Sequence, residues 1–153
     1  MSTSPIIELN NARIFQRENL VLNNVDLAVR PGEFIYLVGR TGTGKSSLMG
    51  TLYGDLPLTQ GEGHVCGFDL HTLKRGQIPF LRRKLGIVFQ DFQLLSDRTV
   101  NENLEFVMKA TGWTDAKRMD QRIQEVLEKV GLGNKGYKLP HELSGGEQQR
   151  VSI

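Results

Sequence analysis

The chain has 153 residues, of which 39% are hydrophobic and 24% are charged, a composition typical of a soluble globular protein with one core. Its net charge of +2 is too small to indicate binding to nucleic acid or to an anionic membrane surface. No apolar run is long enough to span a membrane, and the single cysteine, Cys66, excludes an intramolecular disulfide. The composition therefore predicts a cytoplasmic protein that reaches a membrane only through a partner.

Three strands are predicted in the first forty residues. Residues 6–14 form the first, with Phe15 just beyond it, and residues 19–29 alternate between apolar and polar side chains, as a half-exposed strand would. A turn that contains Pro31 follows. Residues 34–38 are then a short apolar run, which predicts a buried strand.

Residues 39–46 match the pattern G-x-x-x-x-G-K-[ST] of a phosphate-binding loop. Its glycines let backbone amides curl around an anion, where a side chain would block the approach. Lys45 supplies positive charge for the phosphates, and the Ser46 hydroxyl can ligate Mg²⁺. A helix predicted over residues 45–52 points its N-terminal dipole at the phosphates, so the loop is predicted to bind a nucleoside triphosphate rather than to be a plain turn. The predicted contacts are Gly39, Arg40, Thr41, Gly42, Thr43, Gly44, Lys45, Ser46 and Ser47.

The middle of the chain is predicted to add two more strands. Residues 61–66 form a short strand, and residues 77–83 form a helical patch that leads into the apolar run at 85–89. Gln90 follows this second apolar strand directly. Polar groups at such strand ends face ligands in α/β folds, so Gln90 is a candidate site residue.

After Asp91 the predicted elements are all helical. Thr99 is predicted to be the N-cap of a helix over residues 100–110, with Glu102 as the acid of a capping box. Thr114 is predicted to cap a helix that runs to residue 130 with one apolar stripe, and Gly131 ends it. The helical stretch indicates an inserted subdomain.

A second anion-binding helix start follows at residues 143–150, which read L-S-G-G-E-Q-Q-R. Ser144 stands at an N-cap position, and the two glycines leave backbone amides open. Together with the phosphate loop, this stretch resembles the signature motif of the ABC ATPases. The resemblance implies an α/β P-loop NTPase fold with an antiparallel β subdomain and a helical signature subdomain. It also implies a homodimer in which Ser144, Gly145, Gly146 and Glu147 of one copy contact the ATP bound to the other.

The resemblance assigns roles to two more residues. Gln90 matches the glutamine that touches Mg²⁺ and the attacking water, which makes it the catalytic candidate and, with Ser46, a metal ligand. Phe15 matches the aromatic residue that stacks on adenine, where the family more often has tyrosine. Stacking needs only the face of a ring, although a plain core phenylalanine is the alternative.

The domain organisation follows from the same resemblance. Residues 1–90 are expected to form the nucleotide-binding core with its β subdomain, residues 91–143 the helical subdomain, and residues 144–153 the start of the signature helix. The family's next elements are a strand ending in the Walker B aspartate and the catalytic glutamate, and no residue up to Ile153 matches them. We therefore expect an incomplete, truncated domain of an ATP hydrolase, one that binds ATP without turnover.

Within the family, the chain resembles the cell-division ATP-binding proteins at a set of positions between the phosphate loop and the signature. These are Pro79, Leu81, Arg82, Arg83, Gly86, Phe89, Gln90, Asp91, Leu94, Leu95, Asp97, Arg98, Thr99 and Val100. The lipoprotein-release and macrolide-export ATPases are competing assignments. An ABC ATPase of DNA repair is disfavoured because the long insertions of that group are absent.

This resemblance implies an FtsX-like integral membrane partner that controls cell-wall hydrolases. The chain would then lie at the inner face of the plasma membrane and contact the partner near Phe92, Leu94 and Leu95. Packing of Leu94 and Leu95 into the helical subdomain is the competing interpretation.

Overall fold

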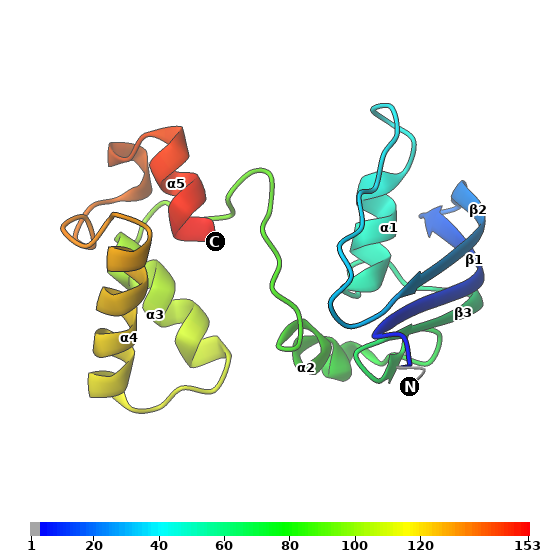
Figure 1. The fold of residues 1–153 in the computed structure, drawn as a ribbon, viewed down its shortest axis with the longest axis horizontal. Coiled ribbons are helices and arrows are strands. Elements are labelled where there is room, and N and C mark those ends of the chain that lie inside the picture. The colour runs from blue at the N-terminus through cyan, green and yellow to red at the C-terminus, as the bar shows by residue number, and fades with distance from the viewer. Residues whose placement is uncertain (1–3) are drawn as a thin grey trace. The chain divides into compact units, whose positions relative to one another are not determined.

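A computed structural model describes residues 4–153 of the chain. The chain divides into two compact units, one that extends to Gly86 and one that runs from Ile87 to Ile153 (Figure 1). The first unit contains an antiparallel sheet with one long helix, and the second unit is helical.

The sheet of the first unit has the strand order β2-β1-β3-β4, with every pair antiparallel. The strands span β1 (Ile7–Gln16), β2 (Asn19–Val29), β3 (Gln60–Val65) and β4 (Phe68–Asp69). The central strand β1 breaks its alternation at Asn11, which has a φ of 47° and whose amide donates to Asp26 Oδ1 at 2.6 Å. This bulge keeps the next apolar side chains of β1 on the buried face.

Helix α1 (Lys45–Leu52) covers the sheet of the first unit (Figure 1). Its residues Leu48 and Leu52 are buried in the same core as Leu9 and Ile14 of β1. A short 3-10 helix, η1 (Arg75–Gln77), leads into α2 (Ile78–Arg82), which inserts the fully buried Leu81 into this core. Helix α1 is thereby packed against the sheet through one shared core.

The two predicted apolar strands are the main corrections to the sequence-based expectations. Residues 34–38 and 85–89 lie outside every strand. Phe34 and Tyr36 are each 80% exposed and Val38 is 88% exposed, so the first segment is not buried. A strand needs a neighbouring backbone for its ladder, and no described residue pairs with either segment. An apolar run alone does not supply that partner.

The second unit packs three α-helices around one core. They are α3 (Val100–Ala110), α4 (Ala116–Lys129) and α5 (Gly145–Ser152), with a 3-10 turn, η2 (Pro140–Glu142), before α5. Its buried core residues are Val100, Ile123, Leu127, Leu132, Leu143 and Val151. Within residues 4–153, none of the helices combines the length and apolarity that crossing a membrane requires.

The N-caps predicted at Thr99 and Ser144 in the second unit are confirmed, and the one predicted at Thr114 is not. The predicted Thr99–Glu102 capping box is confirmed: Thr99 Oγ1 accepts from the Glu102 amide at 3.3 Å, and Glu102 Oε2 accepts from the Thr99 amide at 2.7 Å. The predicted cap at Thr114 is wrong by one residue. Asp115 Oδ1 accepts from the Arg118 amide at 3.1 Å, and α4 begins after it. Aspartate and threonine are both good caps, so the sequence pattern did not distinguish these two adjacent residues.

Candidate nucleotide-binding site

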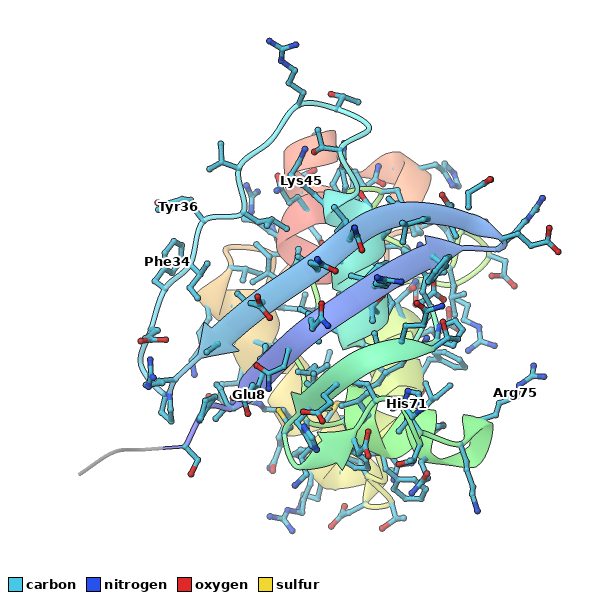
Figure 2. The ribbon with its side chains drawn as sticks, turned by 90° about the vertical axis from the view of Figure 1, so that its right-hand side faces the viewer. Glu8, Phe34, Tyr36, Lys45, His71 and Arg75 are labelled. Carbon is cyan, nitrogen blue, oxygen red and sulfur yellow. The ribbon has the colours of Figure 1, made fainter. Side chains whose placement is uncertain are left out.

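The phosphate loop folds back on itself around the Lys45 ammonium. Lys45 Nζ donates to the carbonyl oxygens of Gly39 and Arg40, each at 2.7 Å. Thr43 Oγ1 donates to the same Arg40 carbonyl at 2.8 Å. Figure 2 shows Lys45 at the start of α1, below the arch of the loop. The cation is therefore held at the position where the loop meets the helix.

Gly44 joins the loop to the helix in a geometry that only glycine allows. Its φ is 93°, in the left-handed region. An added Cβ would also lie 2.7 Å from Val21 Cγ1 and 2.9 Å from Leu22 Cγ, both on β2. The sheet therefore sets how closely the loop approaches, and the glycine at this position is a requirement of packing as well as of backbone conformation.

The N-terminus of α1 differs from the other long helices in having no side-chain cap. Helices α3, α4 and α5 are each capped by a side chain that accepts from a backbone amide of the first turn. The first amides of α1 are thus left to other partners, and the helix dipole favours a negative one. These amides and the ammonium of Lys45 form a donor set that fits a triphosphate.

The other residues at the phosphate loop differ in how far they are exposed to solvent. Arg40, Thr41 and Ser46 are exposed, and the Ser46 hydroxyl at the first turn of α1 is of the type that binds Mg²⁺. The Ser47 carbonyl accepts from Thr51 Oγ1 at 2.9 Å, which ties this residue to the next turn of the helix. The residues therefore fit a nucleotide with its magnesium ion.

Phe15 lies within β1, opposite Leu20 of β2, and not beyond the strand as predicted. It is half-buried and lines a cavity of about 320 Å³. Arg17, Glu18, Leu56, Pro57, Thr59 and Gln60 form the rest of the wall. Its ring thus contributes to the wall of a cavity, and its stacking on adenine stays a prediction.

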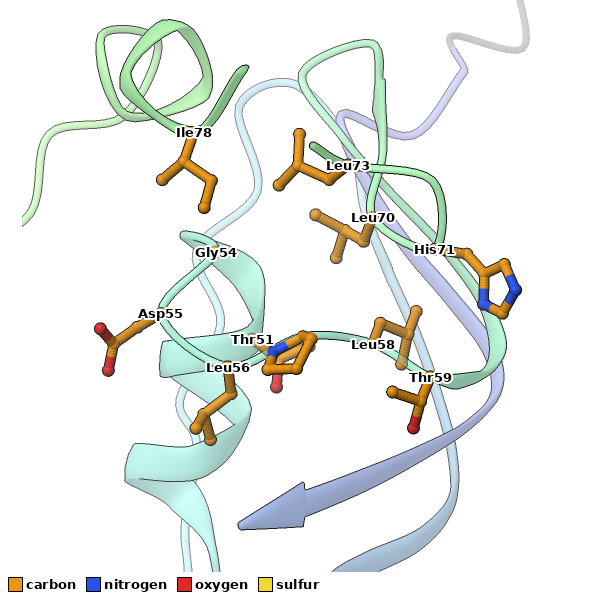
Figure 3. A pocket seen from close by; sticks show the side chains of 11 residues that line it. Thr51, Gly54, Asp55, Leu56, Leu58, Thr59, Leu70, His71, Leu73 and Ile78 are labelled. Atoms are coloured by element: carbon orange, nitrogen blue, oxygen red, sulfur yellow. The ribbon is translucent and has the colours of Figure 1, made fainter. Parts of the chain in front are cut away.

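A second cavity of about 400 Å³ lies at the other end of α1 (Figure 3). Thr51, Gly54 and Asp55 mark this end, and leucine side chains from the loops around it line the wall. The carboxyl end of a helix repels an anion, and the cation beside Asp55, Arg82, is already paired with its carboxylate at 3.7 Å. The N-terminal end of α1, with its uncapped amides and Lys45, therefore suits phosphates better than this cavity does.

The signature segment forms a capped but exposed helix start in the second unit. Ser144 Oγ accepts from the Glu147 amide at 3.3 Å, and Glu147 Oε2 accepts from the Ser144 amide at 2.9 Å. Ser144, Gly145 and Gly146 are exposed, whereas Glu147 is half-buried and forms an ion pair with Lys135. The hydrogen bond from Lys135, helped by the Ser144 amide, lowers the pKa of the Glu147 carboxyl from 4.5 to about 2.

Gln90 belongs to the second unit, and the phosphate loop belongs to the first. Gln90 is exposed and precedes a tight turn in which Phe92 has a φ of 60° and Gln93 one of 52°. Phe92 and Leu95 are half-buried, and Leu94 packs against the core of the unit. For Leu94 this supports the competing interpretation of a core contact.

Asn103 is a structural residue of this region that the sequence interpretation missed. It is buried on α3, and its side-chain amide donates to the carbonyls of Leu95, Arg98 and Thr99 at 3.1, 3.0 and 2.9 Å. Its Oδ1 accepts from the Leu95 amide at 2.7 Å. A polar residue three positions after Val100, on the apolar face of the helix, was the available signal.

The comparisons with known proteins agree with this architecture. A family model described as ABC transporter matches residues 22–153. The chain belongs to the ABC transporter family, and its fold is the α/β fold of the ATP-binding cassette. The dimeric cassette MJ0796, solved in a post-hydrolysis state with ADP and Pi, is 30% identical with a TM-score of 0.84 over 95% of this chain and 66% of that one.

Among curated proteins, the chain is similar to cell-division ATP-binding proteins named FtsE. It is 41% identical to that of Streptococcus pneumoniae over 97% of this chain and 64% of the relative, and 45% identical to that of Bacillus subtilis over 86% and 58%. It is also 38% identical to the methionine import ATP-binding protein MetN of Nocardia farcinica, over 100% of this chain and 47% of the relative. The chain thus spans at most about two thirds of the length of these relatives.

Proposed function

We propose that the whole protein is the ATP-binding and ATP-hydrolysing subunit of a membrane complex of the FtsE type. The observation that carries the proposal is the phosphate loop, where Lys45 stands at the uncapped N-terminus of α1. The sequence identity of 41–45% to FtsE proteins supports the cell-division assignment. ATP binding and hydrolysis would drive a membrane partner that controls cell-wall hydrolases.

In this proposal the nucleotide contacts come from two copies of the chain. The residues from Gly39 to Ser47 bind the phosphates, and Phe15 stacks on adenine. The signature segment of the second copy, from Ser144 to Glu147, lies against the γ-phosphate, so that two ATP molecules lie in the interface of a homodimer. The dimeric state of MJ0796 with ADP and Pi supports this arrangement.

Hydrolysis needs a metal and an oriented water. Mg²⁺, when bound, would neutralise charge on the phosphates, with the Ser46 hydroxyl and the Gln90 amide oxygen as its ligands from this chain. Gln90 is the proposed catalytic residue that orients the attacking water. Residues 1–153 alone are expected to bind ATP without hydrolysing it, because none of them matches the family's general base.

The proposed partner is an FtsX-like integral membrane protein, which would hold the chain at the cytoplasmic face of the plasma membrane. The segment after Gln90, with Phe92, Leu94 and Leu95, is the proposed contact. Phe92 is the proposed anchor because it is the aromatic residue of the three, whereas Leu94 packs against the core. An aromatic anchor at the centre of an interface is often worth about 2 kcal/mol or more.

A second candidate is the ATPase subunit of an importer. The identity of 37–38% to methionine import ATP-binding proteins supports this candidate, and lipoprotein-release and macrolide-export ATPases stay as further alternatives. The cell-division and importer candidates differ in what loss of the gene does. Loss of a cell-division subunit produces elongated, undivided cells with normal methionine uptake, whereas loss of an importer subunit lowers uptake and leaves division normal.

ATP binding is tested by calorimetry on the whole protein with Lys45→Ala. A hydrogen bond to a charged group contributes about 1.5–3 kcal/mol, so the affinity should fall at least about tenfold. Lys117→Ala, which changes an exposed lysine of α4, is the matched control and should bind like wild type. Equal affinities for Lys45→Ala and wild type would refute the assignment of the phosphate loop.

A further inference from the structure

The carboxylate of Glu147 has both of its oxygens engaged within the chain. Oε2 accepts from the Ser144 amide at 2.9 Å, and Oε1 is paired with the Lys135 ammonium. The side chain of Glu147 is 17% exposed and that of Lys135 is 31% exposed. Both groups are therefore largely shielded from solvent and paired with each other next to the exposed residues Ser144, Gly145 and Gly146.

The backbone around Lys135 is fixed on both sides of the ion pair. The Leu132 amide donates to the Leu127 carbonyl at the end of α4 at 2.7 Å, and Leu132 is fully buried. The Lys135 amide donates to the Leu132 carbonyl at 2.9 Å. On the other side, the Val100 amide at the start of α3 donates to the Lys138 carbonyl at 2.9 Å. Lys135 thus projects from a loop anchored to two helices.

The carboxylate of Glu147 has two opposite effects on the binding of an anion at the N-terminus of α5. It caps the helix and so orders the first turn, but its negative charge at the N-terminus opposes the binding of a phosphate that the helix dipole attracts. A cation beside the carboxylate removes most of this opposition and leaves the cap intact. Lys135 is the cation in contact with Glu147.

We infer that Lys135 is a positioning residue of the signature segment: it holds the Glu147 carboxylate in the cap and offsets its charge, so that the amides of the exposed residues Gly145 and Gly146 face the phosphate of a nucleotide on a second copy of the chain. Glu147 then acts through the cap and not as a direct ligand. The inference rests on the proposed function, since it concerns the composite site between two copies.

The experiment measures ATP-analogue binding and analogue-dependent dimerisation of the whole protein, by calorimetry and by sedimentation with a non-hydrolysable ATP analogue. Lys135→Met should leave monomer affinity within about twofold and raise the protein concentration needed for dimerisation about tenfold, because one partner of a charge-assisted bond is lost. Lys135→Arg should keep dimerisation within about threefold of wild type. Lys129→Met is the matched control, because it removes an ion pair with Glu125 on the exposed side of α4 in the same unit.

The double variant Lys135→Met/Glu147→Gln separates positioning from folding. A glutamine oxygen can still accept from the Ser144 amide but carries no charge, so the double variant should dimerise better than Lys135→Met alone. Dimerisation of Lys135→Met at the wild-type concentration would overturn the inference and leave the proposed function standing, as would a double variant no better than the single one. Failure of the wild-type protein to dimerise with the analogue would overturn the proposed composite site itself.

Discussion

Gly44→Ala should be far more damaging than Gly42→Ala, although both glycines have a positive φ, 93° and 85°. An alanine in the left-handed region costs about 1–2 kcal/mol, and both variants bear that cost. At Gly44 the new Cβ would also lie 2.7 Å from Val21 Cγ1 and 2.9 Å from Leu22 Cγ, whereas at Gly42 it would meet no atom within 4 Å. Overpacking of this kind adds about 1–3 kcal/mol, for a total of roughly 2–5 kcal/mol.

Urea unfolding of the whole protein measures the difference between the two variants. With a slope near 2 kcal/mol per molar urea, the midpoint for Gly44→Ala should lie roughly 0.5–1.5 M below that for Gly42→Ala. The ATP affinity of Gly44→Ala should fall as well, because the start of α1 must move away from β2 to relieve the close contacts of the new Cβ. Equal midpoints for the two variants would refute the argument that the sheet sets the position of the loop.

The second unit supplies three further predictions. Thr99→Ala should destabilise the protein by about 1 kcal/mol in urea unfolding, whereas Thr114→Ala should change it by less than about 0.5 kcal/mol, since Asp115 and not Thr114 caps α4. Phe92→Ala should weaken capture of the membrane partner in a pull-down and leave ATP affinity within about twofold; a parallel loss of ATP binding would instead make Phe92 a core residue. The pKa of Glu147 is held at about 2, below its ordinary 4.5, so the stability from its ion pair is present above pH 4.5 and is lost as the pH falls toward 2. Between these pH values the thermal midpoint of Glu147→Gln should therefore fall less steeply than that of the wild-type protein.

The elements that the sequence predicted correctly are those that local chemistry determines. The bounds of α1 follow from the glycine before Lys45, and those of α3 from the capping box of Thr99 and Glu102. The alternation of apolar and polar side chains predicted the bounds of β2, Asn19 and Val29, correctly. Each of these signals lies within a few residues of the element it defines.

Apart from the cap at Thr114, the failures are cases where a distant part of the chain decides. Residues 34–38 have the composition of a buried strand, yet Phe34 and Tyr36 are exposed (Figure 2). Their rings contact each other edge to face, with 4.9 Å between the ring centroids. Whether a neighbouring backbone pairs with an apolar run cannot be read from the run itself. The Lys135–Glu147 pair joins residues twelve positions apart through a loop, and no periodic pattern marks such a contact.

The phosphate loop of one copy and the signature segment of another are proposed to form one ATP site. This is tested most directly by mixing two variants of the whole protein, Lys45→Ala and Ser144→Arg, and measuring ATP hydrolysis. Each variant alone should be inactive, because every site in its homodimer contains one defect. In an equal mixture about half the dimers pair the two variants, and each such dimer has one intact site, so activity should recover to roughly a quarter of wild type. No recovery on mixing, from two variants that still form mixed dimers, would contradict the account.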